Sequence, residues 1–250
     1  MLTTWQKALA EFVATFALIF IGAGAVIVAT NPLSTSGLVG VALAHGMVLA
    51  VMVSVTGHIS GAHINPAVTA AAWVTGNIKS ALAAVYVVAQ LAGAAAGGLL
   101  LQVVFPEAEW RRAALGVPVI NHGVGMTNGK AAVLEAILTF LLVFVVFGTA
   151  VDDRGPFSKI AGLPIGFVLI FDILAGGTLT GAAMNPARAF GPMLASGIWN
   201  DWWVYWVGPV SGGVIAGSLY WFAFLGGREK LVSVRRSDQP IGGGPEEDGA

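Results

Sequence analysis

The sequence predicts an all-α membrane protein in which two inverted repeats each supply three transmembrane helices and one half-length, re-entrant helix. The prediction rests on composition, on the lengths of the apolar segments and on a duplicated motif. Only 10% of the 250 residues are charged and 56% are hydrophobic, whereas a soluble domain carries about 25% charged residues. With a mean hydropathy of +0.82, the chain is too apolar to cover itself with polar side chains, which indicates an integral membrane protein.

Six segments are long and apolar enough to span a bilayer, which takes about 20 apolar residues. Two shorter apolar segments remain, Pro66–Val74 and Pro186–Ser196, and helices of about ten residues reach only about 15 Å. Half-length helices at matching places in the two halves of a chain indicate a site at the membrane midplane. The six predicted spans are roughly Ala8–Ala29, Leu38–Thr56, Leu82–Val104, Ala131–Val151, Ile160–Gly177 and Trp203–Leu225.

The motif Asn-Pro-Ala occurs twice, 120 residues apart, and each copy follows a run of small residues. Asparagine is a favoured helix N-cap, and proline is favoured at the first helical position. Each run, 57–64 and 177–184, is therefore expected to be a non-helical loop that ends where a half-length helix begins. The two boxes comprise Asn65, Pro66 and Ala67 in the first repeat and Asn185, Pro186 and Ala187 in the second.

The two halves of the chain also match outside the boxes. Glu11, with Thr15 four residues later, corresponds to Glu135, with Thr139 four residues later. Because each half has an odd number of spans, the second half enters the membrane from the opposite side, and the repeat is inverted. The expected organisation is one transmembrane domain over residues 1–225, with repeats at about 5–104 and 131–225 joined by an outer loop at 105–130, and a disordered tail at 226–250.

The distribution of lysine and arginine sets the expected orientation. With the N-terminus inside, eight of these residues lie on the inner side and four on the outer side. Cytoplasmic loops carry the excess of positive charge, so both termini, including the tail, are expected in the cytoplasm. The short termini favour a microbial cell membrane as the location.

These features together resemble the aquaporin, or major intrinsic protein, family over about residues 5–225. The resemblance rests on the paired boxes, on Arg188 directly after the second box in the sequence, and on Glu11 and Glu135 in the first and fourth spans. It implies a right-handed bundle of six spans in the lipid bilayer, with one pore in each subunit and a homotetrameric assembly. It also implies passive transport of water and small neutral solutes, with protons and ions excluded.

The boxes are expected to form the barrier to protons and cations. Each half-helix N-terminus carries about half a positive charge, and the amides of Asn65 and Asn185 can donate to a passing water oxygen. Helix capping is the alternative role of these asparagines, and it does not exclude the first. Non-helical backbone is tolerated at membrane depth where it lines a cavity, which predicts a ladder of carbonyl acceptors from Gly61, Ala62, His63, Gly181, Ala182 and Ala183.

Arg188 is a charge inside the membrane, and such charges mark transport pathways. The resemblance places Arg188 at the narrowest point of the pore, in a selectivity filter with His45, Ile173 and Ala182. This set is similar to that of plant tonoplast intrinsic proteins, which implies a wider opening that also passes ammonia and leaves the vacuolar membrane as an alternative location. In the outer loop, His122 is expected to reach the filter and contact Arg188, as a loop histidine does in some of that subgroup.

The other ionisable residues in the spans are expected to have structural roles. The resemblance implies that Glu11 and Glu135 hydrogen-bond the loops before the boxes from behind, with a proton relay as the alternative. Asp172 is the one charge for which the sequence offers no role. Four histidines, with no cysteine and no histidine pair at helical spacing, predict no metal site, and a net charge of −1 argues against nucleic acid as a partner.

Other functions are compatible with parts of this pattern. Glycerol facilitators resemble the chain, but they typically place an aspartate and a basic residue where Ala189 and Met193 follow Arg188. A secondary active transporter also uses inverted repeats and broken helices, yet two positive helix ends at the midplane disfavour cation coupling. A structural, junction-forming membrane protein has no need of two intact boxes and Arg188. No nucleophile–base set, phosphate loop or cofactor motif supports an enzyme.

Overall fold

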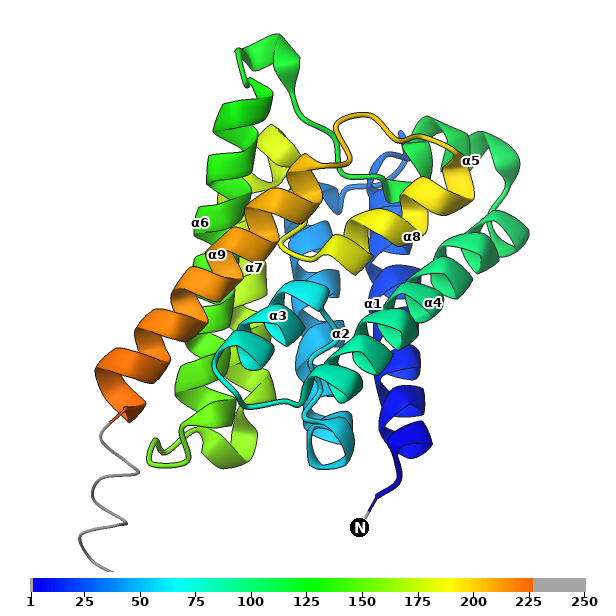
Figure 1. The fold of residues 1–250 in the computed structure, drawn as a ribbon. Helices are drawn as coiled ribbons and strands as arrows, with labels where there is room; N and C mark the ends of the chain where they lie inside the picture. Colours follow the sequence, from blue (N-terminus) through cyan, green and yellow to red (C-terminus); the bar gives the residue numbers. More distant parts are fainter. Residues whose placement is uncertain (1, 227–250) are drawn as a thin grey trace, which may run out of the picture.

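The computed structural model describes residues 2–226, and in this part of the chain every regular element is a helix. Six helices are long and apolar enough to cross a membrane, which confirms the predicted spans. Figure 1 shows them as a tilted bundle with both described chain ends at one face, which is called the inner face below. They are α1 (Thr4–Ala29), α2 (Gly37–Ser60), α4 (Ser80–Val104), α6 (Asn128–Val146), α7 (Gly162–Thr180) and α9 (Val204–Tyr220).

Short elements complete the bundle at both faces. α6 and α9 each end in a π-helical turn, Phe147–Val151 and Trp221–Leu225, at the inner face. The outer loop carries α5 (Glu107–Arg112) and two single 3₁₀ turns, Ala114–Gly116 and His122–Val124, and another 3₁₀ turn, Ser158–Ile160, precedes α7. The predicted tail lies outside the described residues from position 227 onward.

The two half-length helices are α3 (Pro66–Val74) and α8 (Pro186–Ser196). At 9 and 11 residues, they are about 14 and 17 Å long, so neither crosses a hydrocarbon core of about 30 Å. Figure 1 shows their N-terminal ends meeting near the centre of the bundle. The predicted pair of re-entrant helices is thereby confirmed.

The segments before the boxes are shorter than the sequence predicted. Residues 57–60 and 177–180 are the last turns of α2 and α7, so the prediction of a non-helical run across them is wrong. Each helix stops at a glycine with a left-handed backbone, Gly61 at φ 89° and Gly181 at φ 84°. Small residues suit a helix as well as a loop, and only the left-handed glycine marks where the helix ends.

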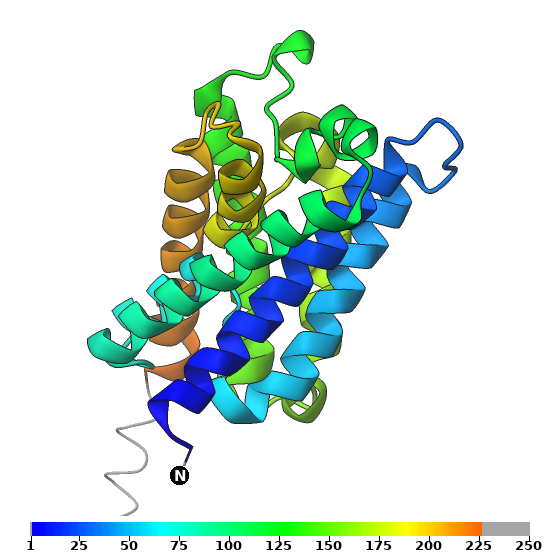
Figure 2. The ribbon, with the colours of Figure 1, turned by 90° about the vertical axis from the view of Figure 1, so that its right-hand side faces the viewer.

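The long helices pack closely at equivalent places in the two repeats. A side chain at Gly93 of α4 would collide with the Phe12 carbonyl of α1, and one at Gly212 of α9 would collide with the Ala136 carbonyl of α6. Small residues of this kind let membrane helices approach backbone to backbone. Figure 2 shows α1 and α4 side by side along one wall of the bundle, and α6 and α9 form the equivalent pair in the second half.

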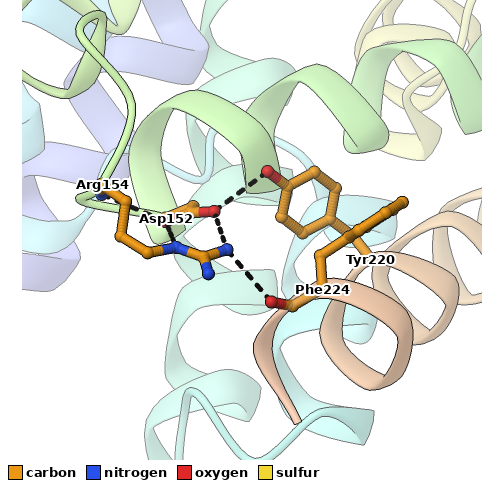
Figure 3. Close-up of polar contacts among 4 residues, drawn as sticks. All are labelled: Asp152, Arg154, Tyr220 and Phe224. Atoms are coloured by element: carbon orange, nitrogen blue, oxygen red, sulfur yellow. Dashed lines mark hydrogen bonds and ion pairs between the residues drawn. The ribbon is translucent and has the colours of Figure 1, made fainter. Parts of the chain in front are cut away.

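A polar cluster ties the α6–α7 loop to the end of α9 at the inner face (Figure 3). The Asp152 carboxylate accepts hydrogen bonds from Arg154 Nε at 2.8 Å and Nη2 at 2.6 Å, and from Tyr220 Oη at 3.1 Å. Arg154 Nη2 also donates to the Phe224 carbonyl at 3.0 Å. The hydrogen bonds from Arg154 hold the pKa of Asp152 well below its usual range, so this joint persists wherever Asp152 is ionised.

Replacing Asp152 by Asn is expected to loosen this joint and to lower the unfolding temperature by about 2–4 °C, a shift typical of one lost interaction in a chain of this size. A carboxylate whose pKa is lowered by folding stabilises above its unfolded pKa and loses that contribution as pH falls through the folded value. The difference between D152N and wild type should therefore shrink in strong acid. Thermal unfolding in detergent at several pH values measures it. Arg111→Gln, in an exposed ion pair with Glu107, is the matched control that should unfold like wild type.

Candidate functional site

The two boxes are joined by reciprocal hydrogen bonds at the centre of the bundle. Asn65 Nδ2 donates to the Met184 carbonyl at 2.9 Å, and Asn185 Nδ2 donates to the Ile64 carbonyl at 3.0 Å. Each side-chain oxygen caps its own half-helix, since Asn65 Oδ1 accepts from Ala67 N and Asn185 Oδ1 accepts from the second half-helix. An amide carries two N–H donors, so each asparagine keeps one more for the cavity that both residues line.

Two buried glutamates hold the loops before the boxes. Glu11 accepts from Ser60 Oγ at 2.6 Å, from the His63 and Ile64 amides at 2.9 and 2.7 Å, and from Gln90 Nε2 at 2.8 Å. In the second repeat, three equivalent bonds reach Glu135, from Thr180 Oγ1 at 2.7 Å and from the Ala183 and Met184 amides at 3.0 and 2.8 Å. Both carboxyls are fully buried and surrounded by these donors, which is the geometry expected for their structural role.

These bonds stabilise backbone that non-glycine residues rarely adopt. Ala62 and Ile64 have φ of 49° and 56°, and Ala182 and Met184 have φ of 43° and 52°. A left-handed non-glycine residue costs about 1–3 kcal/mol, so each loop depends on its glutamate. Among the described residues, no protein donor bonds to the carbonyls of the six residues of the predicted ladder, Gly61, Ala62, His63, Gly181, Ala182 and Ala183. These carbonyls remain available as acceptors.

Two tyrosines that the sequence did not single out for the site complete its support. Tyr86 Oη donates to the Ser60 carbonyl at 2.6 Å, and Tyr205 Oη donates to the Thr180 carbonyl at 2.9 Å. They occupy equivalent places in α4 and α9, and both are fully buried. Their spacing of 119 residues, close to the spacing of the boxes, is the signal that could have identified them.

The four predicted filter residues lie at the boundary between a central and an outer cavity. His45, Ala182 and Arg188 line the central cavity, and Ile173 lines the outer one together with Arg188. All four are at least 95% buried. Arg188 Nη1 donates to the Gly116 carbonyl of the outer loop at 2.8 Å, and this contact was not foreseen because it depends on the path of the loop.

The central cavity, called the waist below, is much smaller than the cavities on its outer and inner sides. The centre offers about 30 Å³ to the centres of water molecules, against 350 Å³ in the outer cavity and 400 and 420 Å³ in two inner ones. A water molecule needs about 10–15 Å³ on this measure, so the waist admits about two at a time. Val53 lines both the centre and one inner cavity, and His63 lines both the centre and the other, so both inner cavities adjoin the centre.

His122 lies apart from the filter. Its Nδ1 is 2.8 Å from the Met126 carbonyl, its Nε2 is 3.2 Å from Asp201 Oδ2, and Asn128 Nδ2 donates to Asp201 Oδ1 at 2.6 Å. The structure therefore corrects the prediction of a contact between His122 and Arg188. The sequence could not place His122, because the acid that binds it comes from a loop 79 residues away.

The His122–Asp201 contact is expected to be sensitive to pH. The hydrogen bond to Asp201 raises the pKa of His122 above its ordinary value, which is about 6.5. A group whose pKa is raised by folding contributes its stabilisation below the unfolded pKa and loses it as pH rises through the folded pKa. In an NMR titration, Asp201→Asn should lower the pKa of His122 towards the ordinary value, whereas Glu107→Gln should leave it unchanged. An unaltered titration in D201N would contradict the assigned cause.

Asp172 stays without an assigned role. It is 1% exposed, and neither side-chain oxygen has a hydrogen-bond partner among the described residues. It does not line the four cavities above. Within residues 2–226, no three histidine, aspartate or glutamate side chains gather as metal ligands would.

Six membrane-spanning helices around two re-entrant half-helices, with paired asparagines at the waist of linked cavities, define a membrane channel. The chain belongs to the major intrinsic protein family, whose model matches residues 1–220. It is 45% identical over 234 residues to aquaporin TIP4-4 of Zea mays, covering 90% of each chain. It is 40% identical over 236 residues to aquaporin TIP2-1 of Arabidopsis thaliana, covering 92% of each chain.

A solved structure has the same fold. The aquaglyceroporin from Plasmodium falciparum superposes with a TM-score of 0.78 at 23% sequence identity, covering 93% of this chain and all of that one. The likeness confirms the predicted arrangement of six spans and two half-helices. At this level of identity it concerns the fold and not the solute.

Proposed function

We propose that the protein is a passive water channel that also passes ammonia and excludes protons and ions. The observation that carries the proposal is the meeting of two half-helix N-termini, each capped by an asparagine, at the narrow centre of the linked cavities. The amides of Asn65 and Asn185 supply donors there, and the free loop carbonyls supply acceptors. This alternation lets a file of water molecules exchange its hydrogen bonds with the wall, and the relatives named aquaporins support the same function.

Ion exclusion follows from the charges at the waist. Each half-helix N-terminus carries about half a positive charge, and both point at the same place. Arg188 adds a full positive charge in a buried position at the outer side of the waist. A cation or a proton meets repulsion at both points, which is how pores of this kind block charge.

Ammonia permeation is inferred from the composition of the filter. Ile173 gives the outer cavity an apolar wall beside Arg188, and Ala182, which lines the central cavity with Arg188, has only a methyl group as its side chain. A neutral solute that is hydrated less strongly than an ion can pass such a boundary. The similarity to plant TIP aquaporins supports this specificity and also supports the vacuolar membrane over a microbial cell membrane as the location.

Stopped-flow light scattering of proteoliposomes tests the water pathway, and internal alkalinisation after an ammonium gradient tests the ammonia pathway. Water permeability equal to that of empty liposomes would overturn the channel proposal. Ammonia entry equal to that of empty liposomes would overturn the ammonia proposal alone. The double variant His45→Phe with Ile173→His should suppress ammonia and spare water, because it fills the filter with a ring from each side.

The assembly is proposed to be a homotetramer in the lipid bilayer, with both termini in the cytoplasm. An exposed apolar stripe runs along α2 through Leu43, Met47, Val51 and Val55, which suits contact with lipid or with other copies of the chain. Native mass spectrometry from detergent should give four-subunit particles. Monomers alone would contradict the assembly without affecting the pore of a single subunit.

A further inference from the structure

A glycine in α1 lies directly behind the filter histidine. Gly22 is buried, and a Cβ built on it would be 2.5 Å from both Cδ2 and Nε2 of His45 and 2.9 Å from Cε1. Carbon atoms in contact are normally about 3.5–4.0 Å apart. The imidazole therefore occupies space that any side chain at position 22 would fill.

The His45 ring is fixed on its other edge by its own helix. Its Nδ1 is 2.9 Å from the Val41 carbonyl, and a carbonyl oxygen can only accept, so Nδ1 is the donor. Nε2 then lies against Gly22 and has no protein partner among the described residues. Since His45 also lines the central cavity, α1 is behind the ring and the cavity is its open side.

The internal repeat gives independent support. The offset between Glu11 and Glu135 pairs Gly22 with Val146, and the offset between Gly61 and Gly181 pairs His45 with Ile165. Both Val146 and Ile165 line the central cavity. The second repeat thus has a side chain in the glycine position and an aliphatic residue in place of the imidazole, so no ring there requires a glycine behind it.

We propose that Gly22 is a specificity-determining residue of the pore, because it forms the recess that keeps the His45 imidazole back from the lumen. Gly22 acts through His45 and is therefore a positioning residue. A methyl group there needs the ring to move by about 1 Å to restore normal contact, and the open side is a waist of about 30 Å³. The inference rests on the proposed channel function.

The test is a double-variant cycle in proteoliposomes, with water and ammonia as the probes. Gly22→Ala should lower water permeability per channel at least threefold and change the ratio of ammonia to water permeability. In a His45→Ala background, the same change should have no further effect, because the methyl group then has no ring to displace. A role of Gly22 in helix packing alone would give the same loss in both backgrounds, and that result would overturn the proposal.

Gly24 supplies the matched control on the same helix. A Cβ on Gly24 would lie 3.4 Å from Leu101 Cδ2, which is ordinary contact, so Gly24→Ala should conduct like wild type. If G22A does not fold, recovery of folded, conducting protein in the G22A/H45A pair supports the proposal, and failure of that pair to fold overturns it. A conducting wild type with an unaffected G22A overturns this inference alone, whereas a non-conducting wild type overturns the channel function and this inference with it.

Discussion

Replacing Glu135 by Leu is expected to prevent the accumulation of folded protein. The carboxylate accepts from the Thr180 hydroxyl at the end of α7 and from two backbone amides in the loop where Ala182 and Met184 have left-handed backbones. A buried donor left without a partner costs about 1–3 kcal/mol, and here three are lost together. The sum of several kcal/mol is comparable to the whole stability of a typical protein, about 5–15 kcal/mol.

The measurement is the yield of monodisperse protein in detergent together with its unfolding temperature. Glu135→Gln keeps one acceptor oxygen and the size of the side chain, so it should give folded protein of intermediate stability. Glu11→Leu should fail as severely as Glu135→Leu, because Glu11 occupies the equivalent place in the first repeat. A proton-relay role predicts the opposite pattern, in which E135L folds normally and loses only transport.

The elements with a strong physical signal were predictable from the sequence. Hydropathy defines the six spans, since a lipid-exposed segment must satisfy its own backbone hydrogen bonds, as a helix does, and the lengths of the two remaining apolar segments exclude a full crossing. Duplication identified the asparagines and the glutamates, because a pair of residues repeated at equal spacing is held by the same structural requirement. Arg188 was identified because burying a charge in a membrane costs free energy, and such residues usually have a function in transport.

Features that depend on distances between elements were not predictable. α2 continues to Ser60 and does not stop before residue 57, because small residues fit both a helix and a loop. The partner of His122 depends on where two outer loops run, and the sequence carries no pattern for that path. The recess at Gly22 depends on the distance between α1 and α2, which hydropathy does not determine.

Replacing Arg188 by Val is expected to let protons and small cations through while water still passes. Two unit charges 4 Å apart at an effective dielectric of 20 interact by about 4 kcal/mol, so removing the guanidinium takes away a large part of the repulsion at the outer side of the waist. The half-helix N-termini still repel cations, which limits the increase in proton and cation permeability. We expect proton permeability to rise at least tenfold, and water permeability to stay within about threefold of wild type.

Arg188→Lys separates the charge of this residue from its shape. Lysine keeps the positive charge but lacks the planar fork of arginine, so it should exclude ions while holding the Gly116 carbonyl less well. The two variants are compared in the same proteoliposomes, by a trapped pH-sensitive dye for protons and by light scattering for water. If R188V is as impermeable to protons as wild type, the proton barrier lies wholly at the paired helix ends around Asn65 and Asn185. If R188K leaks as R188V does, the geometry of the Gly116 contact, and not the charge, closes the filter to ions.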